Sequence, residues 1–100
     1  MFENCYNLSV FNAPLLQHTN SSYAMFKNCK NINYIDAPFI KDNCEYAFMG
    51  CTNLTVINLP NLSGSSNRYS NTNMFTDCSS LISVNIPSLK YIANNMFDNC

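Results

Sequence analysis

The chain has 100 residues and a formal net charge of −1; 47% of its residues are hydrophobic and only 11% are charged. The apolar share suffices for a buried core, while amides and hydroxyls supply most of the polarity. With five basic residues, the chain lacks the positive surface that binding to nucleic acid or to an anionic membrane requires. No apolar run approaches the roughly 18 residues of a transmembrane helix, so we expect no membrane insertion.

A five-residue phrase ending in cysteine, mostly Met-Phe-x-x-Cys, recurs along the chain. Its copies begin near residues 1, 25, 47, 74 and 96, at spacings of 24, 22, 27 and 22 residues. The cysteines that end the phrase are Cys5, Cys29, Cys51, Cys78 and Cys100. A phrase that returns at a period in the twenties indicates a stacked repeat rather than a disulfide scaffold.

A short apolar stretch follows each of the first four cysteines of the phrase. Apolar residues stand three, six and eight positions after the cysteine, and a proline follows at position nine. Positions six and eight share one face of an extended segment, and position seven points outward. Because proline has no backbone donor, it ends the strand. We therefore predict one short strand per repeat, stacked on its neighbours in a parallel sheet.

The Met-Phe phrase is predicted to form the wall opposite the sheet, with its phenylalanine ring pointing into the core. For this return segment we favour a short helix or 3₁₀ turn, with irregular coil as the alternative. The polar segments before the phrase vary in length, and the loop at 63–67 accounts for the longest repeat.

The repeat resembles the BspA-like (Treponema pallidum-type) leucine-rich repeat. The matching stretches are CTNLTVINLP at 51–60 and CSSLISVNIP at 78–87. The resemblance implies an α/β solenoid, a right-handed array of about four coils, each with one short parallel strand and a short helical or irregular return segment. A parallel β-helix is the rival architecture, but it needs two or three strands per coil, and only one strand-like stretch recurs here.

We expect residues 1–100 to form a single solenoid. Neither terminus resembles a polar cap, although an open solenoid end exposes core residues and strand edges. The expectation is therefore a fragment of a longer array or a protein whose ends dock onto something, with end-to-end self-association as the corresponding hypothesis.

The repeated cysteines are predicted to be buried thiols that act as small apolar residues. Cys44 stands outside the phrase, and we expect it to be the exposed, readily reactive thiol. A zinc site lacks ligands, because there is no Cys-x-x-Cys and the single histidine is His18. The carboxylates show no repeated pairing, and a Cys–His nucleophile pair has few candidates in a solenoid. We predict no enzyme activity, no metal and no cofactor; a cysteine-dependent enzyme is the remote alternative.

The outward-facing strand positions are the candidate partner-binding residues. Together with an exposed pair beside the long loop, they are Val10, Asn12, Tyr34, Asp36, Val56, Asn58, Ser83, Asn85, Arg68 and Tyr69. The polar residues at position seven would stack as an amide ladder, and the strip would serve as a contact surface with Tyr34 as its aromatic anchor. The two interpretations are compatible. Tyrosines in the variable segments suit either recognition or the edge of the core; they are Tyr23, Tyr46, Tyr69 and Tyr91.

The leading functional hypothesis is a non-catalytic repeat module for recognition or adhesion, which binds a protein or glycan on a cell or virion surface. The alternative is a structural spacer or a self-assembling virion or surface component with no ligand of its own. The resemblance implies an extracellular, cell-surface or virion-associated location, because members of the family are surface or secreted adhesion-type proteins and the repeat also occurs in phage tail-type proteins. No signal peptide is visible in this chain.

Overall fold

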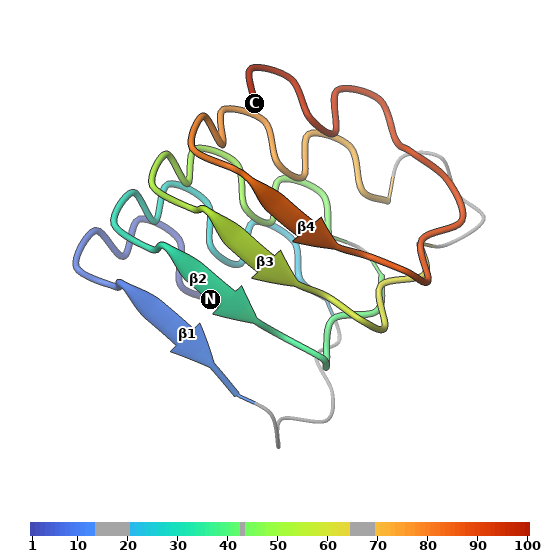
Figure 1. The fold of residues 1–100 in the computed structure, drawn as a ribbon, viewed down its shortest axis with the longest axis horizontal. Helices are drawn as coiled ribbons and strands as arrows, with labels where there is room; N and C mark the ends of the chain where they lie inside the picture. The colour runs from blue at the N-terminus through green and yellow to red at the C-terminus, as the bar shows by residue number, and fades with distance from the viewer. Residues whose placement is uncertain (14–20, 43, 65–69) are drawn as a thin grey trace.

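The computed structural model describes residues 1–13, 21–42, 44–64 and 70–100. Its four strands are β1 (Val10–Asn12), β2 (Tyr34–Asp36), β3 (Val56–Asn58) and β4 (Ser83–Asn85). They form one parallel sheet in the order β1-β2-β3-β4, so each strand pairs with the strand of the next repeat (Figure 1). The prediction of one short parallel strand per repeat is confirmed.

The strands pair without offset, so equivalent positions of successive repeats lie side by side. Phe11 pairs with Ile35, and Ile35 pairs with Ile57. The ladder extends one residue beyond β2 and β3, because the amide of Ala37 donates to the carbonyl of Asn58 and that of Leu59 to Asn85, at 3.1 and 2.9 Å. The next residue in each repeat is proline, which has no amide to continue the ladder and therefore ends the strand.

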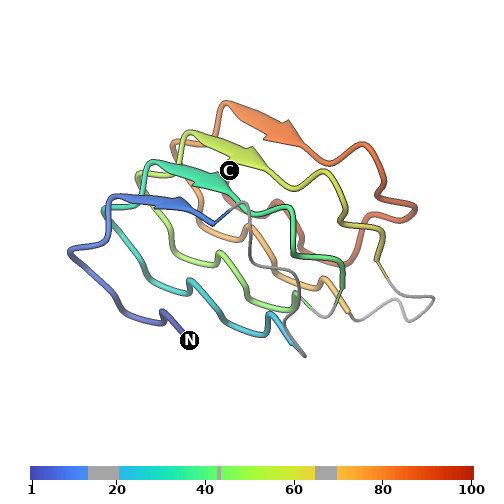
Figure 2. The same cartoon turned by 90° about the horizontal axis from the view of Figure 1, so that it is seen from below.

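The return segments at 22–29, 44–51, 71–78 and 94–100 lie opposite the sheet (Figure 2) and consist of turns, with no helix in the described parts of the chain. The favoured helix or 3₁₀ turn, and with it the α/β label, is therefore wrong for these residues, and the turns fit the alternative of an irregular return segment. Consistently, no described helix could cross a membrane.

Alternate amides of each return segment bond to the neighbouring segment. Phe26 donates to the carbonyl of Ala47 at 2.7 Å and Asn28 to that of Met49 at 2.8 Å, while Cys29 closes a turn onto Phe26 at 3.0 Å. A helix would use its amides along its own axis, and it is about 10 Å wide against a strand spacing of roughly 4.8 Å. Turns instead keep both walls of the solenoid at the same spacing.

The residue before each repeated cysteine has a left-handed backbone. The φ angles are 59° at Asn4, 59° at Asn28, 74° at Gly50, 62° at Asp77 and 57° at Asn99. Asn, Asp and Gly tolerate this conformation best, so these residue types before cysteine are a turn signal that the sequence reasoning missed. At Gly50 a Cβ atom would also collide with Oδ1 of Asn28.

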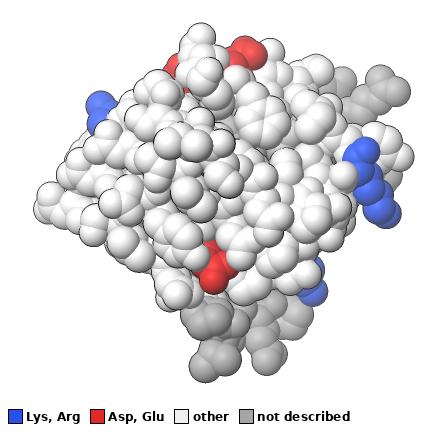
Figure 3. Space-filling model, viewed as in Figure 1, with Lys and Arg blue, Asp and Glu red and all other residues white. Residues whose placement is uncertain are grey.

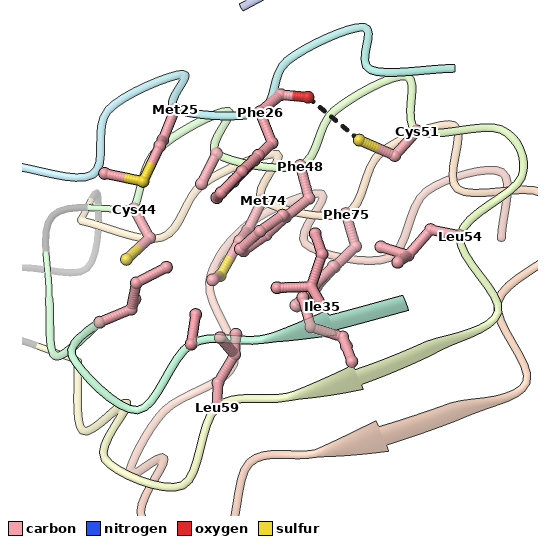
Figure 4. Packing of buried hydrophobic residues seen from close by; sticks show 14 of the residues in the cluster. Met25, Phe26, Ile35, Cys44, Phe48, Cys51, Leu54, Leu59, Met74 and Phe75 are labelled. Carbon is pink, nitrogen blue, oxygen red and sulfur yellow. Dashed lines mark hydrogen bonds between the residues drawn. The ribbon is translucent and has the colours of Figure 1, made fainter. Parts of the chain in front are cut away.

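A ladder of stacked phenylalanine rings fills the space between the two walls. The rings of Phe2, Phe26, Phe48, Phe75 and Phe97 stack with successive centroid distances of 5.3, 5.5, 5.5 and 5.2 Å. Figure 4 shows the three inner rings lying above Ile35 of β2 and Leu59, which directly follows β3, and all of these side chains are fully buried. The predicted inward position of the phenylalanine is confirmed. Handedness, coil number and the single-solenoid assignment for residues 1–100 remain predictions.

Candidate partner-binding face

The outer face of the sheet carries two straight rows of side chains. One row is Val10, Tyr34, Val56 and Ser83, and the other is Asn12, Asp36, Asn58 and Asn85. Both rows are straight because the strands pair without offset. The structure thus brings all eight predicted strand residues together, whereas the predicted Arg68 and Tyr69 lie outside the described residues.

The polar row forms a hydrogen-bonded ladder across β2, β3 and β4. Asn58 donates from Nδ2 to Oδ1 of Asp36 at 2.9 Å, and Asn85 donates from Nδ2 to Oδ1 of Asn58 at 2.6 Å. The predicted stacking of the polar residues is confirmed for these three. Because each asparagine amide has a second N–H group and a second lone pair, the ladder retains capacity for a partner while its side chains are already ordered.

The other row is apolar at three of its four positions, all but Ser83, and it is open to solvent. Val10 is 54% exposed, Val56 is 37% exposed, and Tyr34 between them is 36% exposed. These residues cannot join the core, because side chains alternate along a strand. The next residue of each strand, six positions after the repeated cysteine, already fills the inner face of the sheet. An apolar row beside ordered polar groups matches the composition of a protein interface.

The face is almost uncharged. Asp36 is the one charged residue among the eight. Seen from the side on which the strands lie, the surface is mostly uncharged, and basic side chains lie near its rim (Figure 3). A partner of this face would therefore be selected by shape and hydrogen bonding more than by electrostatic steering.

The repeated cysteines form a second ladder inside the molecule. The thiols of Cys29, Cys51 and Cys78 donate to the carbonyls of Phe2, Phe26 and Phe48 of the preceding repeat, with Sγ–O distances of 2.9, 3.1 and 3.2 Å. Figure 4 shows the bond between Cys51 and Phe26. All six cysteines lie within the described residues, and all are free. Burial is confirmed for these three, while Cys5 is half-buried and Cys100 is exposed.

The predicted exposure of Cys44 is wrong. Its side chain is 0% exposed, and its thiol donates to the carbonyl of Asp42 at 3.1 Å. Cys44 stands seven residues before a repeated cysteine, where the neighbouring repeats place the buried residues Ser22 and Asn71. This inward position escaped the sequence reasoning because Ser, Cys and Asn share no apolar pattern. Burial raises the pKa of the Cys44 thiol to about 12.

We expect a thiol reagent at neutral pH to modify Cys5 and Cys100 first. Cys29, Cys44, Cys51 and Cys78 are 0% exposed, so they should react only when the chain opens. Time-resolved mass spectrometry of the labelled protein measures both classes, with the denatured chain as the control in which all six thiols react. Rapid modification of Cys44 in the folded protein would contradict its burial.

The chemistry of the buried thiols does not match that of a nucleophile. A cysteine nucleophile requires a lowered pKa, whereas burial raises the pKa of Cys44 and Cys78 to about 12. Among the described residues, no three His, Cys, Asp or Glu side chains gather where they could hold a metal ion, and His18 lies outside these residues.

The repeat unit is now defined by one strand, one turn-built return segment, a stacked phenylalanine and a cysteine that bonds to the preceding repeat. The family model of the BspA type leucine rich repeat region matches residues 1–100 with six copies. The chain belongs to this family. No curated protein and no solved structure matched the chain. BspA-type leucine-rich repeats are repeat modules of protein interaction, generally non-catalytic and commonly surface-associated.

Proposed function

We propose that this BspA-type repeat is a non-catalytic recognition module that binds a protein or glycan on a cell or virion surface through its outer sheet face. The observation that carries the proposal is the exposed row Val10–Tyr34–Val56, which lies in register beside the hydrogen-bonded Asp36–Asn58–Asn85 ladder. A protein partner suits this face best, because an apolar row gains most from burial against another apolar surface.

The two rows have complementary roles. The aromatic ring of Tyr34 lies between two valines in the middle of the apolar row, the position that usually contributes most to binding. The polar ladder orders its own side chains before a partner arrives, which reduces the entropy lost on binding.

The double variant Tyr34→Ser with Asp36→Asn tests the proposal. The other strands carry Ser83 and Asn58 at the same registers, so the replacements suit the fold. We expect the free energy of unfolding to change by less than about 1 kcal/mol and partner affinity to fall at least tenfold, because the aromatic anchor is lost. Proteins and glycans are first purified from surface extracts by their binding to the immobilised wild-type chain. Their affinity for the wild type and for each variant is then measured by interferometry.

The control for this experiment is Tyr91→Ser, because Tyr91 is 66% exposed and lies outside the strands. Equal affinity of the double variant and the wild type would remove the sheet face from consideration.

The alternative role is a structural spacer or self-assembling component with no ligand of its own. It predicts no binding to surface extracts or to a glycan array, together with clear self-association in light scattering. End-to-end self-association belongs to this alternative and is measured in the same experiment.

A further inference from the structure

Two repeated cysteines, Cys5 and Cys29, lie side by side on neighbouring repeats and away from the strands; they are here called the thiol pair. Both are free, and Cys5 is half-buried whereas Cys29 is buried. The two thiols are close enough for a hydrogen bond between their side chains and for a charge interaction. The structure thus places two sulfur ligands next to each other, and one of them can be reached from solvent.

Backbone hydrogen bonds hold the thiol pair in one orientation. The amide of Phe2 donates to the carbonyl of Met25 at 2.7 Å, which joins the two segments. The amides of Cys5 and Cys29 close the same turn, onto Phe2 at 3.1 Å and onto Phe26 at 3.0 Å. The rings of Phe2 and Phe26 stack with centroids 5.3 Å apart and planes 15° apart. Equivalent side chains of the two segments therefore point the same way, one coil spacing apart.

This spacing suits a bridging metal ion better than a disulfide. Backbones that pair as strands do place equivalent atoms about 4.8 Å apart. A disulfide needs Cβ atoms about 3.8 Å apart, so it would have to draw the two segments together by about 1 Å. A metal–thiolate bond is roughly 2.3 Å long, so two thiolates on opposite sides of one ion lie about 4.6 Å apart. An ion between the two sulfur atoms therefore fits with little movement of the backbone.

The number and type of ligands select the ion. Within the described residues, no group of three His, Cys, Asp or Glu side chains could hold a metal ion, so the thiol pair has no third ligand of these types. The lack of a tetrahedral ligand set excludes zinc but not a two-coordinate ion. Thiolates are soft ligands that favour Cu(I), which accepts two ligands in line. Cu(I) would replace one proton on each thiol, so that two protons are released and the S–Cu–S unit carries a net charge of about −1 without any change in oxidation state.

We propose that Cys5 and Cys29 form a two-coordinate binding site for Cu(I) that links two neighbouring coils of the solenoid. The ion enters at the half-buried Cys5. The thiol of Cys29, which now donates to the carbonyl of Phe2 at 2.9 Å, exchanges this bond for a bond to the metal. The thiol pair shares no residue with the outer sheet face, so copper binding and partner recognition can fail independently.

Thiol labelling locates the ion. The protein is mixed under anaerobic conditions with one equivalent of Cu(I), supplied as its acetonitrile complex, and is then treated with iodoacetamide at neutral pH. We expect modification of Cys5 to slow at least tenfold, while the exposed Cys100 reacts as it does without the metal. Mass spectrometry of the digested protein measures both rates. The site is refuted if Cys5 is not protected, or if Cys100 is protected as strongly as Cys5.

Serine variants test the two ligands. Affinity for Cu(I) is measured by competition with bicinchoninate, and it should fall at least tenfold in Cys5→Ser and in Cys29→Ser. The matched control is Cys44→Ser, because Cys44 is a buried free cysteine outside the thiol pair whose thiol donates to Asp42. This variant should bind Cu(I) as the wild type does. If Cys29→Ser does not fold, Cys5→Ser decides alone, since Cys5 is only half-buried; unchanged affinity in Cys5→Ser overturns the proposal.

Two further measurements test the coordination. X-ray absorption spectroscopy of the copper-loaded protein should show two sulfur neighbours in line, and three or more neighbours would contradict a two-coordinate site. One equivalent of Cu(I) should raise the melting temperature of the wild type but not that of Cys5→Ser, because an ion that binds only the folded chain stabilises it. An equal rise in both proteins would place the ion elsewhere.

Discussion

Replacing Phe48 by alanine should lower the free energy of unfolding by about 3–5 kcal/mol. The ring is fully buried and stacks between Phe26 and Phe75, with both centroid distances at 5.5 Å. Its removal leaves a cavity that cannot collapse, because hydrogen-bonded ladders hold the walls on both sides at a fixed spacing. Equilibrium unfolding in urea, followed by circular dichroism, measures the loss.

The matched control for this prediction is Phe97→Ala. Phe97 is partly buried and stacks on Phe75 at 5.2 Å. Its replacement should lower the free energy of unfolding by less than half as much, because fewer contacts are lost and water can fill the space. Phe48→Leu keeps most of the buried volume and should remain folded if the alanine variant does not. Equal losses for Phe48→Ala and Phe97→Ala would contradict the role of the inner ring.

Alkaline pH should destabilise the protein steeply. Burial raises the pKa of the Cys44 and Cys78 thiols from the ordinary value of 9.0 to about 12. The unfolded chain therefore loses these protons first. The stability that the protonated thiols contribute is complete below pH 9 and is lost as the pH rises towards about 12. Each such thiol should lower the free energy of unfolding by about 1.4 kcal/mol per pH unit in this window.

Single variants separate the thiols from the other groups that titrate in the same range. In each of the two variants, Cys44→Ala and Cys78→Ala, the slope of the free energy of unfolding against pH should be shallower than that of the wild type by about 1.4 kcal/mol per pH unit. The three chains differ only at the replaced cysteine, so the difference in slope isolates one thiol. Urea unfolding between pH 9 and 11 supplies the slopes, and a slope equal to that of the wild type would show that the thiol titrates freely in the folded state.

Local spacing was sufficient to locate the strands, the inward phenylalanines and the polar ladder. Ile35 and Ala37 stand two residues apart before a proline, and the same spacing returns in every repeat. In a stacked array an apolar position that recurs at each period has to face the interior, because each coil buries its apolar side only against its neighbours. The register of Asp36 with Asn58 then followed from alignment of the repeats.

The environment of Cys44 and the backbone of the return segments could not be found in the same way. The position of Cys44 carries serine or asparagine in neighbouring repeats, so no apolar periodicity marks it as buried. From the sequence we expected the return segment to form a short helix, in which each amide bonds within its own segment. In the structure the amide of Phe26 instead donates to the carbonyl of Ala47, 21 residues further along the chain.

The amino-acid pattern thus determined which side chains face inward and how the strands align, because both depend on spacing within one repeat. The tertiary structure decided how the return segment is built, which thiols are shielded and which residues adopt a left-handed backbone. These features depend on the distance between neighbouring coils, which selects turns over a helix and assigns each amide its partner in another repeat.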